Sequence, residues 1–494
     1  MMHIARQKHL NLALMGIPRR AESTDRSALA MTFVAAGSFS AMLHSTDHQI
    51  LYGRRGTGKT HALLYLSDLI ERTGDAAVYL DLRTIGSAGG MYADSNLSPA
   101  VRGTHLLVDT LEAIHEELLV VALEREIGDQ NGLLLALDAL AEAATAVQVV
   151  GEVERETTVG DSAESSVDIE LTVSPNAKVS ATRRTSATAE SRLRRTGIER
   201  HHVVFGPLSR ALRGITSALG PARLWLLLDE WSSVPLDLQP LLADLLRRSV
   251  LPTAGITVKI AAIERRSRFS QPSPSGDYVG IEVGADAASA VSLDDFMIFD
   301  NARSRAQEFF GQLFHNHAST RLSAMIVQPP LDADSFIEAT FCRNTFPELV
   351  RAAEGVPRDA INIAALAAQH AHDEPIGLPD VRRAARDWYL RDKQTAINAN
   401  EPARQMLRLL VDEVVGRRHS RTFLLDQLVS ARHETIDELY DGFAIDYGCY
   451  VDLLLDGDQH SRPRDRGGWL NSPKGVPPDE FSLAKEAIHL AKLE

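Results

Sequence analysis

Residues 48–74 read HQILYGRRGTGKTHALLYLSDLIERTG, and this stretch decides the fold. Its first five residues form a short apolar run that stops at a glycine-rich turn, which predicts a buried strand over 48–52. After the turn, apolar residues recur at helical spacing as far as Gly74, a residue that commonly ends a helix. The stretch therefore predicts a strand, a glycine-rich loop and a helix in direct succession.

The loop matches the pattern G-x-x-x-x-G-K-[ST], known as Walker A. Glycines let the backbone curl so that successive N–H groups face the phosphates of a nucleotide, and the following helix directs its positive end at them. Lys59 is expected to reach the β- and γ-phosphates, and Thr60 to offer its hydroxyl to Mg²⁺. The ligands predicted from this pattern are ATP and Mg²⁺. The predicted phosphate-binding residues are Gly53, Arg54, Arg55, Gly56, Thr57, Gly58, Lys59 and Thr60.

A second motif, LWLLLDEW, occupies residues 224–231. Its apolar run predicts a buried strand that delivers Asp229 and Glu230 to its carboxyl end, the edge where parallel sheets bind ligands. Asp229 is expected to hold Mg²⁺, directly or through water, and Glu230 to orient or deprotonate the attacking water. An apolar run followed by two acids is a weak signal alone, but it becomes strong beside the Gly53–Thr60 loop.

Further strands are predicted at 76–85, 222–231 and 256–266, with helical patterns between them. This alternation predicts an α/β fold, a P-loop NTPase parallel sheet with helices on both faces. After about residue 345 the pattern becomes helical, and near the end it resembles a winged helix. The predicted divisions are an N-terminal lead-in at 1–45, an ATPase core at 46–340 with a β-hairpin-like insertion at 148–200, a helical lid at 341–398, and a winged-helix-like domain with a C-terminal helix at 399–494.

Together the two motifs resemble those of AAA+ ATPases of the initiator, origin-recognition-complex-like type, over roughly residues 30–370. KIAAIERRSRF (259–269) looks like the sensor 1 strand, and its Glu264-Arg265 ending is closer to that of STAND-type ATPases. The resemblance implies Arg265 as a γ-phosphate contact. EGVPRDAINIA (354–364) resembles the sensor 2 motif of the AAA+ lid, which implies that Arg358 reaches the nucleotide. A solvated basic loop and an ordinary helix start are the alternative explanations of these two segments.

Residues 382–432 hold eleven Lys or Arg and six Asp or Glu, in a chain whose net charge is -14. A basic winged helix suggests a surface for double-stranded DNA. The proposed recognition helix, HETIDELYDGF (433–443), holds four acids, which is poor for entering a groove. DNA contact and protein contact by this region both stay open.

Composition limits the setting in which the protein acts. With only Cys342 and Cys449, a disulfide framework and a cysteine-based zinc site are excluded, and a reducing compartment is favoured. The first twenty residues lack the features of a secretory signal, and no stretch of 18 apolar residues occurs. We expect a cytoplasmic protein with no membrane contact.

The sequence thus predicts an ATP-hydrolysing AAA+ protein whose nucleotide cycle drives a conformational or assembly change, in a DNA-linked role such as loading, recruitment or defence against foreign DNA. A homo-oligomer or a protein partner is expected. The alternative is a nucleotide-gated switch or scaffold that turns ATP over slowly and acts through protein partners.

Overall fold

The computed structural model describes most of the chain up to residue 417. The described residues are 2–21, 24, 26–34, 39–85, 92, 94, 96–125, 127–145, 148–150, 200–202, 205–272, 278–286, 289–293, 303–394, 398 and 400–417. Within these ranges, no helix is both long enough and apolar enough to cross a membrane.

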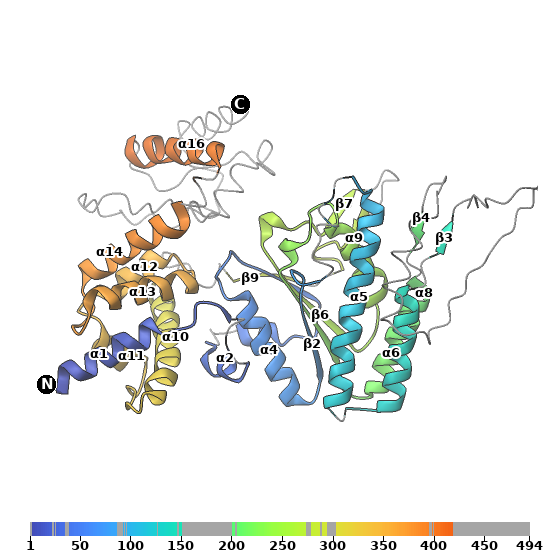
Figure 1. The fold of residues 1–494 in the computed structure, drawn as a ribbon, viewed down its shortest axis with the longest axis horizontal. Coiled ribbons are helices and arrows are strands. Elements are labelled where there is room, and N and C mark those ends of the chain that lie inside the picture. The colour runs from blue at the N-terminus through green and yellow to red at the C-terminus, as the bar shows by residue number, and fades with distance from the viewer. Residues whose placement is uncertain are drawn as a thin grey trace, which may run out of the picture.

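The described residues form a five-stranded sheet at the centre of the molecule (Figure 1). The strand order is β2-β5-β6-β1-β9, and every neighbouring pair is parallel. The bounds are β1 Gln49–Tyr52, β2 Ala76–Asp81, β5 Leu224–Asp229, β6 Ile256–Ala262 and β9 Ser289–Ser292. All six residues of β5 and all seven of β6 are buried, because strands covered on both faces need apolar side chains on both. The predicted parallel sheet is confirmed.

Three of the strands end earlier than their apolar patterns predicted, and β5 ends at Asp229, two residues before its predicted end. β2 ends at Asp81, whose carboxylate accepts a hydrogen bond from the backbone N–H of Arg83 and closes a turn. β6 ends at Ala262 and is followed by a 3₁₀ turn at Glu264–Arg266. In each case the chain leaves the sheet where charged residues begin, at its ligand-binding edge.

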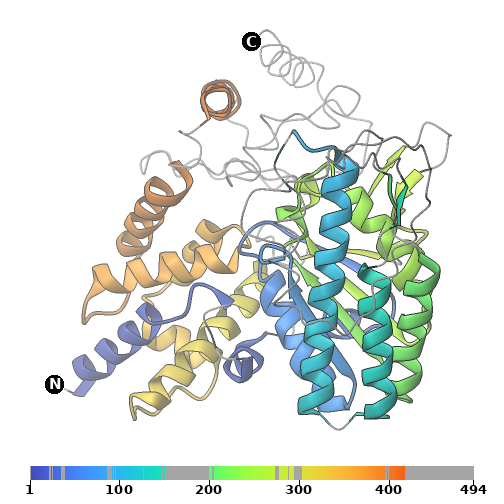
Figure 2. The same ribbon diagram turned by 45° about the vertical axis from the view of Figure 1, so that its right-hand side comes forward.

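Helices cover the two faces of the sheet, and the alternation of side chains along β5 shows how. Trp225 and Leu227 belong to a core shared with α4 (Lys59–Thr73), whereas Leu224, Leu226 and Leu228 belong to the core on the other face. That second core is built by α5 (Pro99–Glu124), α6 (Gln130–Thr145), α8 (Phe205–Leu219) and α9 (Gln239–Leu245). Figure 2 shows α5, α6 and α8 side by side over this face. The fold is therefore a three-layer α/β arrangement.

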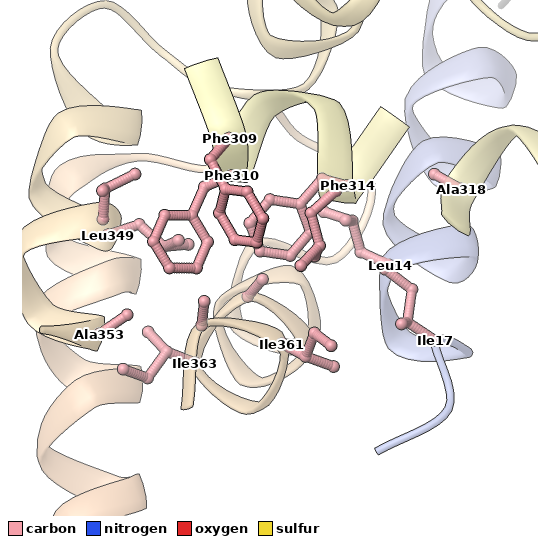
Figure 3. Close-up of a cluster of buried hydrophobic side chains, with 14 of the residues drawn as sticks. Leu14, Ile17, Phe309, Phe310, Phe314, Ala318, Leu349, Ala353, Ile361 and Ile363 are labelled. Atoms are coloured by element: carbon pink, nitrogen blue, oxygen red, sulfur yellow. The ribbon is translucent and has the colours of Figure 1, made fainter. Parts of the chain in front are cut away.

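A helical region follows the sheet in the chain and adjoins the face that α4 covers. It contains α10 (Arg303–Ala324), α11 (Ala333–Thr340), α12 (Thr345–Ala353), α13 (Pro357–Ala371) and α14 (Leu378–Trp388). Phe309, Phe310 and Phe314 of α10 project toward Leu349 of α12 and Ile361 of α13 (Figure 3). Below, α12, α13 and α14 are called the lid.

The first helix, α1 (Met2–Met15), packs into this helical region rather than onto the sheet. Leu14 and the following Ile17 reach the same apolar cluster (Figure 3). Buried Asn11 donates from Nδ2 to the backbone oxygens of His372, at 2.6 Å, and Glu374, at 3.0 Å. The start of the chain is thus bonded to the end of α13.

The remaining elements are short. Helices α2 (Arg26–Thr32) and α3 (Phe39–Leu43) precede β1, and β7 (Ser270–Pro272) pairs with β8 (Tyr278–Gly280). Past the lid lie a π-helical turn at Tyr389–Lys393, α16 (Glu401–Leu409) and another π-helical segment at Leu410–Arg417. Two further irregular turns cover Trp231–Ser233 and Leu246–Val250.

Two sequence predictions fall largely or wholly outside the described residues. The base of the 148–200 insertion is an antiparallel pair, β3 (Gln148–Val150) with β4 (Arg200–His202), as a hairpin requires, and 151–199 lie outside. Of the winged-helix-like domain and C-terminal helix predicted at 399–494, residues 418–494 lie outside the described residues, and the recognition helix at 433–443 is among them. The domain boundaries stay predictions.

Candidate nucleotide site

The loop between β1 and α4 has the backbone that its glycines predict. Gly56 and Gly58 have φ angles of 87° and 96°, which residues with a side chain rarely adopt. At Gly53, a Cβ atom would lie 2.5 Å from Oγ1 of Thr57, so a residue with a side chain would clash with Thr57 at this position. Thr57 stabilises the curl by donating from Oγ1 to the backbone oxygen of Arg54 at 2.8 Å.

Lys59 opens α4 and points back into the curl of the loop. Its Nζ donates to the backbone oxygens of Gly53 at 2.8 Å and Arg54 at 3.0 Å, and the side chain is buried. An ammonium held inside a ring of backbone groups is a suitable partner for a phosphate oxygen. Thr60, the next residue, lies in the first turn of the same helix, partly exposed.

Asp229 ends β5 and is completely buried. Its Oδ2 accepts a hydrogen bond from the hydroxyl of Tyr79 at 2.9 Å, and its Oδ1 accepts one from the backbone N–H of Glu230 at 2.8 Å. Two donors hold the carboxylate in one orientation, and its remaining lone pairs leave capacity for a cation or a water.

Glu230 follows in a left-handed conformation, with φ 55°. This conformation costs on the order of 1 kcal/mol for a non-glycine residue, and it turns the chain out of β5 into the Trp231–Ser233 turn. The carboxylate lies 3.8 Å from Nη1 of Arg83 and accepts a hydrogen bond from Oγ of Ser233 at 3.4 Å. The proposed base is thus less buried than Asp229 and has a cation beside it.

The sheet topology brings the two motifs to the same edge. β6 lies between β1 and β5, with Tyr52 beside Ala262 and Leu228 beside Ile260. Because neighbouring strands are about 4.8 Å apart, the ends of β1 and β5 lie roughly 10 Å from each other. That span suits a triphosphate held by the loop with its terminal group near Asp229 and Glu230.

Arg265 lies in the turn directly after β6, so it leaves the sheet between the two motifs. Its side chain is partly exposed. The buried Gln239 links this turn to the one after Asp229: Nε2 donates to the backbone oxygens of Val234, at 2.8 Å, and Arg266, at 3.1 Å.

Arg358, the second residue of α13, lies directly against the phosphate loop. Its backbone N–H donates to the oxygen of Gly56 at 3.2 Å. A Cβ atom on Gly56 would come within 2.8 Å of the Cβ of Arg358. The structure therefore brings together the loop and the lid residue that the resemblance implied, although about 300 residues separate them in the sequence.

Three residues of the site were missed from the sequence: Tyr79, Arg83 and Gln239. Tyr79 lies on β2, where Asp81 is the register partner of Asp229, so its proximity follows from strand pairing. Arg83 forms a close ion pair with Asp81 and a longer one with Glu230. The only sequence signal for Tyr79 and Arg83 was their position in the strand predicted at 76–85.

Two histidines near the loop, His61 on α4 and His317 on α10, carry little positive charge at neutral pH. Burial lowers the pKa of His61, whose Nε2 donates to the backbone oxygen of Leu29 at 2.8 Å. Burial, helped by the nearby His61, lowers the pKa of His317 to about 4. The local positive charge at the loop therefore comes from Lys59 and the arginines.

Comparison with known proteins gives limited similarity. No protein-family model and no curated protein matches this chain. Among solved structures, the chain is similar to Cdc6p from Pyrobaculum aerophilum, at 11% identity and a TM-score of 0.33, over 97% of this chain and 89% of that chain. It is also similar to the Orc1 protein of Aeropyrum pernix in complex with DNA, at 11% identity and a TM-score of 0.28, over 83% of this chain and 77% of that chain. The chemistry of the loop, the two acids and the lid, rather than these distant likenesses, indicates what the protein does.

Proposed function

We propose that this protein is an ATPase of the AAA+ initiator-like type that binds ATP with Mg²⁺ and hydrolyses it to ADP and phosphate. The observation that carries the proposal is the meeting of three parts at one sheet edge. The buried Lys59 inside its loop, the buried Asp229 with Glu230 beside it, and Arg358 of the lid all lie there. Lys59 is suited to bind phosphate, Asp229 to bind the cation and Glu230 to bind the water, and Arg358 adds a cation from the lid.

The donor set fits Mg²⁺. A threonine hydroxyl and a buried carboxylate oxygen are hard oxygen ligands, which this cation prefers, usually together with water and phosphate oxygens. Thr60 and Asp229 would hold it, with Tyr79 fixing the orientation of the Asp229 carboxylate. When bound, the cation supplies neutralisation of charge on the β- and γ-phosphate oxygens.

In the proposed reaction, Glu230 orients the attacking water and accepts its proton. The water adds to the γ-phosphorus in line with the departing ADP oxygen, and Lys59 stabilises the charge that develops on the phosphate oxygens. Arg358, from the lid, and Arg265, from the end of β6, are the proposed additional cations. This assignment of Arg265 follows the STAND-like ending of its strand.

We further propose a DNA-linked role and self-assembly for this ATPase. Arg382, Arg383 and Arg386 are exposed on α14, the described start of the basic 382–432 segment. Arg382 is ion-paired with Glu348 at 3.0 Å, which leaves the other two for a polyanion. Clustered arginines on one helix suit phosphate contacts along a DNA backbone.

Steady-state hydrolysis by the purified protein, with and without double-stranded DNA, tests the proposal. We expect measurable turnover that Lys59→Ala abolishes, and a loss of on the order of a hundredfold or more in Glu230→Gln, as for removal of a general base. Stimulation by DNA that falls as salt rises would support the DNA-linked role. Turnover that Glu230→Gln leaves unchanged would contradict the catalytic assignment.

One observation favours the alternative of a slow, nucleotide-gated switch. Arg83 lies beside Glu230 and competes with water for its carboxylate. In that case Arg83→Ala should raise turnover severalfold, whereas a purely structural Arg83 would lower it or leave it unchanged. Size-exclusion chromatography with and without ATP is the companion measurement, because a switch of this kind requires a nucleotide-dependent change in assembly.

A further inference from the structure

The phosphate loop holds two consecutive arginines with opposite environments. Arg55 is exposed, whereas Arg54 is 4% exposed. The Walker A pattern accepts any residue at these two positions, so nucleotide binding alone does not explain why one guanidinium is buried. Nη2 of Arg54 donates to the backbone oxygen of Glu354 at 3.0 Å.

The acceptor is a tight turn between α12 and α13. Glu354 and Gly355 both have left-handed backbones, with φ angles of 44° and 76°. Two residues after Gly355 the chain enters α13, and the backbone N–H of Arg358 donates back to the oxygen of Gly56. Two hydrogen bonds in opposite directions therefore join residues 54–56 of the loop to residues 354–358 of the lid.

Arg54 is also in contact with the lysine of the site. Its backbone oxygen accepts hydrogen bonds from Nζ of Lys59 at 3.0 Å and from Oγ1 of Thr57 at 2.8 Å. A phosphate oxygen that binds Lys59 competes with this carbonyl for the ammonium. The backbone of Arg54 is thus sensitive to phosphate, while its side chain holds the lid.

We infer that Arg54 is a positioning residue that clasps the lid to the phosphate loop and transmits phosphate binding at Lys59 to the lid. The transmission part rests on the proposed ATP binding, but the clasp itself does not. The path is contiguous, from Lys59 Nζ to the Arg54 backbone and from the Arg54 side chain to Glu354. A measured effect of nucleotide on the lid is what establishes that binding is transmitted along this path.

Hydrogen–deuterium exchange of the full-length chain without nucleotide tests the clasp. Arg54→Ala removes a charged donor to the partly buried backbone oxygen of Glu354, which corresponds to roughly tenfold in a local opening equilibrium. Amides at 354–361 should therefore exchange on the order of tenfold faster, while those in β5 and β6 stay unchanged. Arg55→Ala is the matched control: it removes the same charge from the same loop but keeps the backbone N–H, the group through which the loop is predicted to bind phosphate, and the exposed Arg55 side chain is not bonded to the lid. Equal exchange at 354–361 in the two variants would overturn the clasp.

The coupling is tested by adding Mg²⁺ and a non-hydrolysable ATP analogue at saturation. We expect the unaltered chain and Arg55→Ala to show a nucleotide-dependent change in exchange across 354–371, and Arg54→Ala to lose most of it. Arg54→Lys, which keeps a donor in the loop, should recover part of the response. A full response in Arg54→Ala would refute the coupling. If the unaltered chain binds no analogue by calorimetry, the proposed function and the coupling both fail, whereas the exchange without nucleotide still decides the clasp.

Discussion

Replacing Gly56 with alanine is the sharpest test of how the lid meets the phosphate loop, because Gly58 provides a matched control. Both glycines have left-handed backbones of nearly equal φ, 87° and 96°. A side chain in that conformation costs about 1–2 kcal/mol at either position. A Cβ at Gly58 meets nothing within 4 Å, whereas one at Gly56 lies 2.8 Å from the Cβ and 2.9 Å from the Nε of Arg358.

The difference between the two variants therefore isolates the lid contact. The Cβ of Arg358 is fixed to its helix and has to move by several tenths of an ångström, and overpacking of this kind costs about 1–3 kcal/mol. Gly58→Ala should lower stability by about 1–2 kcal/mol and Gly56→Ala by about 2–5 kcal/mol in total.

Thermal unfolding followed by circular dichroism, without nucleotide, measures this difference. For domains of about 150–250 residues each kcal/mol corresponds to a shift of about 2–4 °C in the midpoint. We expect the midpoint of Gly56→Ala to lie several degrees below that of Gly58→Ala. Equal midpoints would show that α13 does not rest on the loop as described, and would remove the structural basis for assigning Arg358 to the site.

Two further outcomes follow from buried polar groups near the site. Tyr79→Phe removes a hydrogen bond to the buried Asp229 carboxylate, so the free energy of unfolding should fall by about 1.5–3 kcal/mol. Because the carboxylate then lacks one donor, adding Mg²⁺ with ATP should raise the thermal midpoint of this variant more than that of the unaltered chain. An equal rise in both would count against Asp229 as a cation ligand. Because burial lowers the pKa of His317 to about 4, the unfolded chain binds more protons than the folded one between pH 6.5 and 4, and stability falls as the pH falls through that window. His317→Phe should reduce this fall by up to roughly 3 kcal/mol, measured by unfolding at pH 4, 5, 6 and 7, and an unchanged pH profile would contradict a buried neutral imidazole.

The local parts of the site could be predicted from the sequence because each is a short continuous pattern. The loop from Gly53 to Thr60 needs glycines because its backbone has positive φ angles that other residues rarely adopt. The spacing of these glycines can be recognised directly in the sequence. The placement of Asp229 and Glu230 follows from a buried run that ends in acids. The parallel sheet could be predicted for a similar reason, because strands covered on both faces have continuous apolar runs. The structure confirms this sheet.

Contacts between distant segments could not be predicted in this way. The bond from Arg54 to Glu354 joins residues 300 positions apart and uses a backbone oxygen, which leaves no trace in residue type. Tyr79 reaches Asp229 only because β2 and β5 pair in one particular register. The roles of Arg265 and Arg358 stay predictions, although the structure places Arg358 on the loop.

The position of α1 has a consequence for how the protein is synthesised. Asn11 binds the backbone oxygen of His372, 361 residues further along the chain. At about 5–20 residues per second, a ribosome needs about 20–70 s to make the segment between them. Until α10 and α13 have been made, the apolar face of α1, with Leu10, Ala13 and Leu14, lacks the helices against which it packs in the structure. The nascent chain therefore offers this face to chaperones or to neighbouring nascent chains until α10 and then α13 emerge, and slow translation would lengthen the exposure.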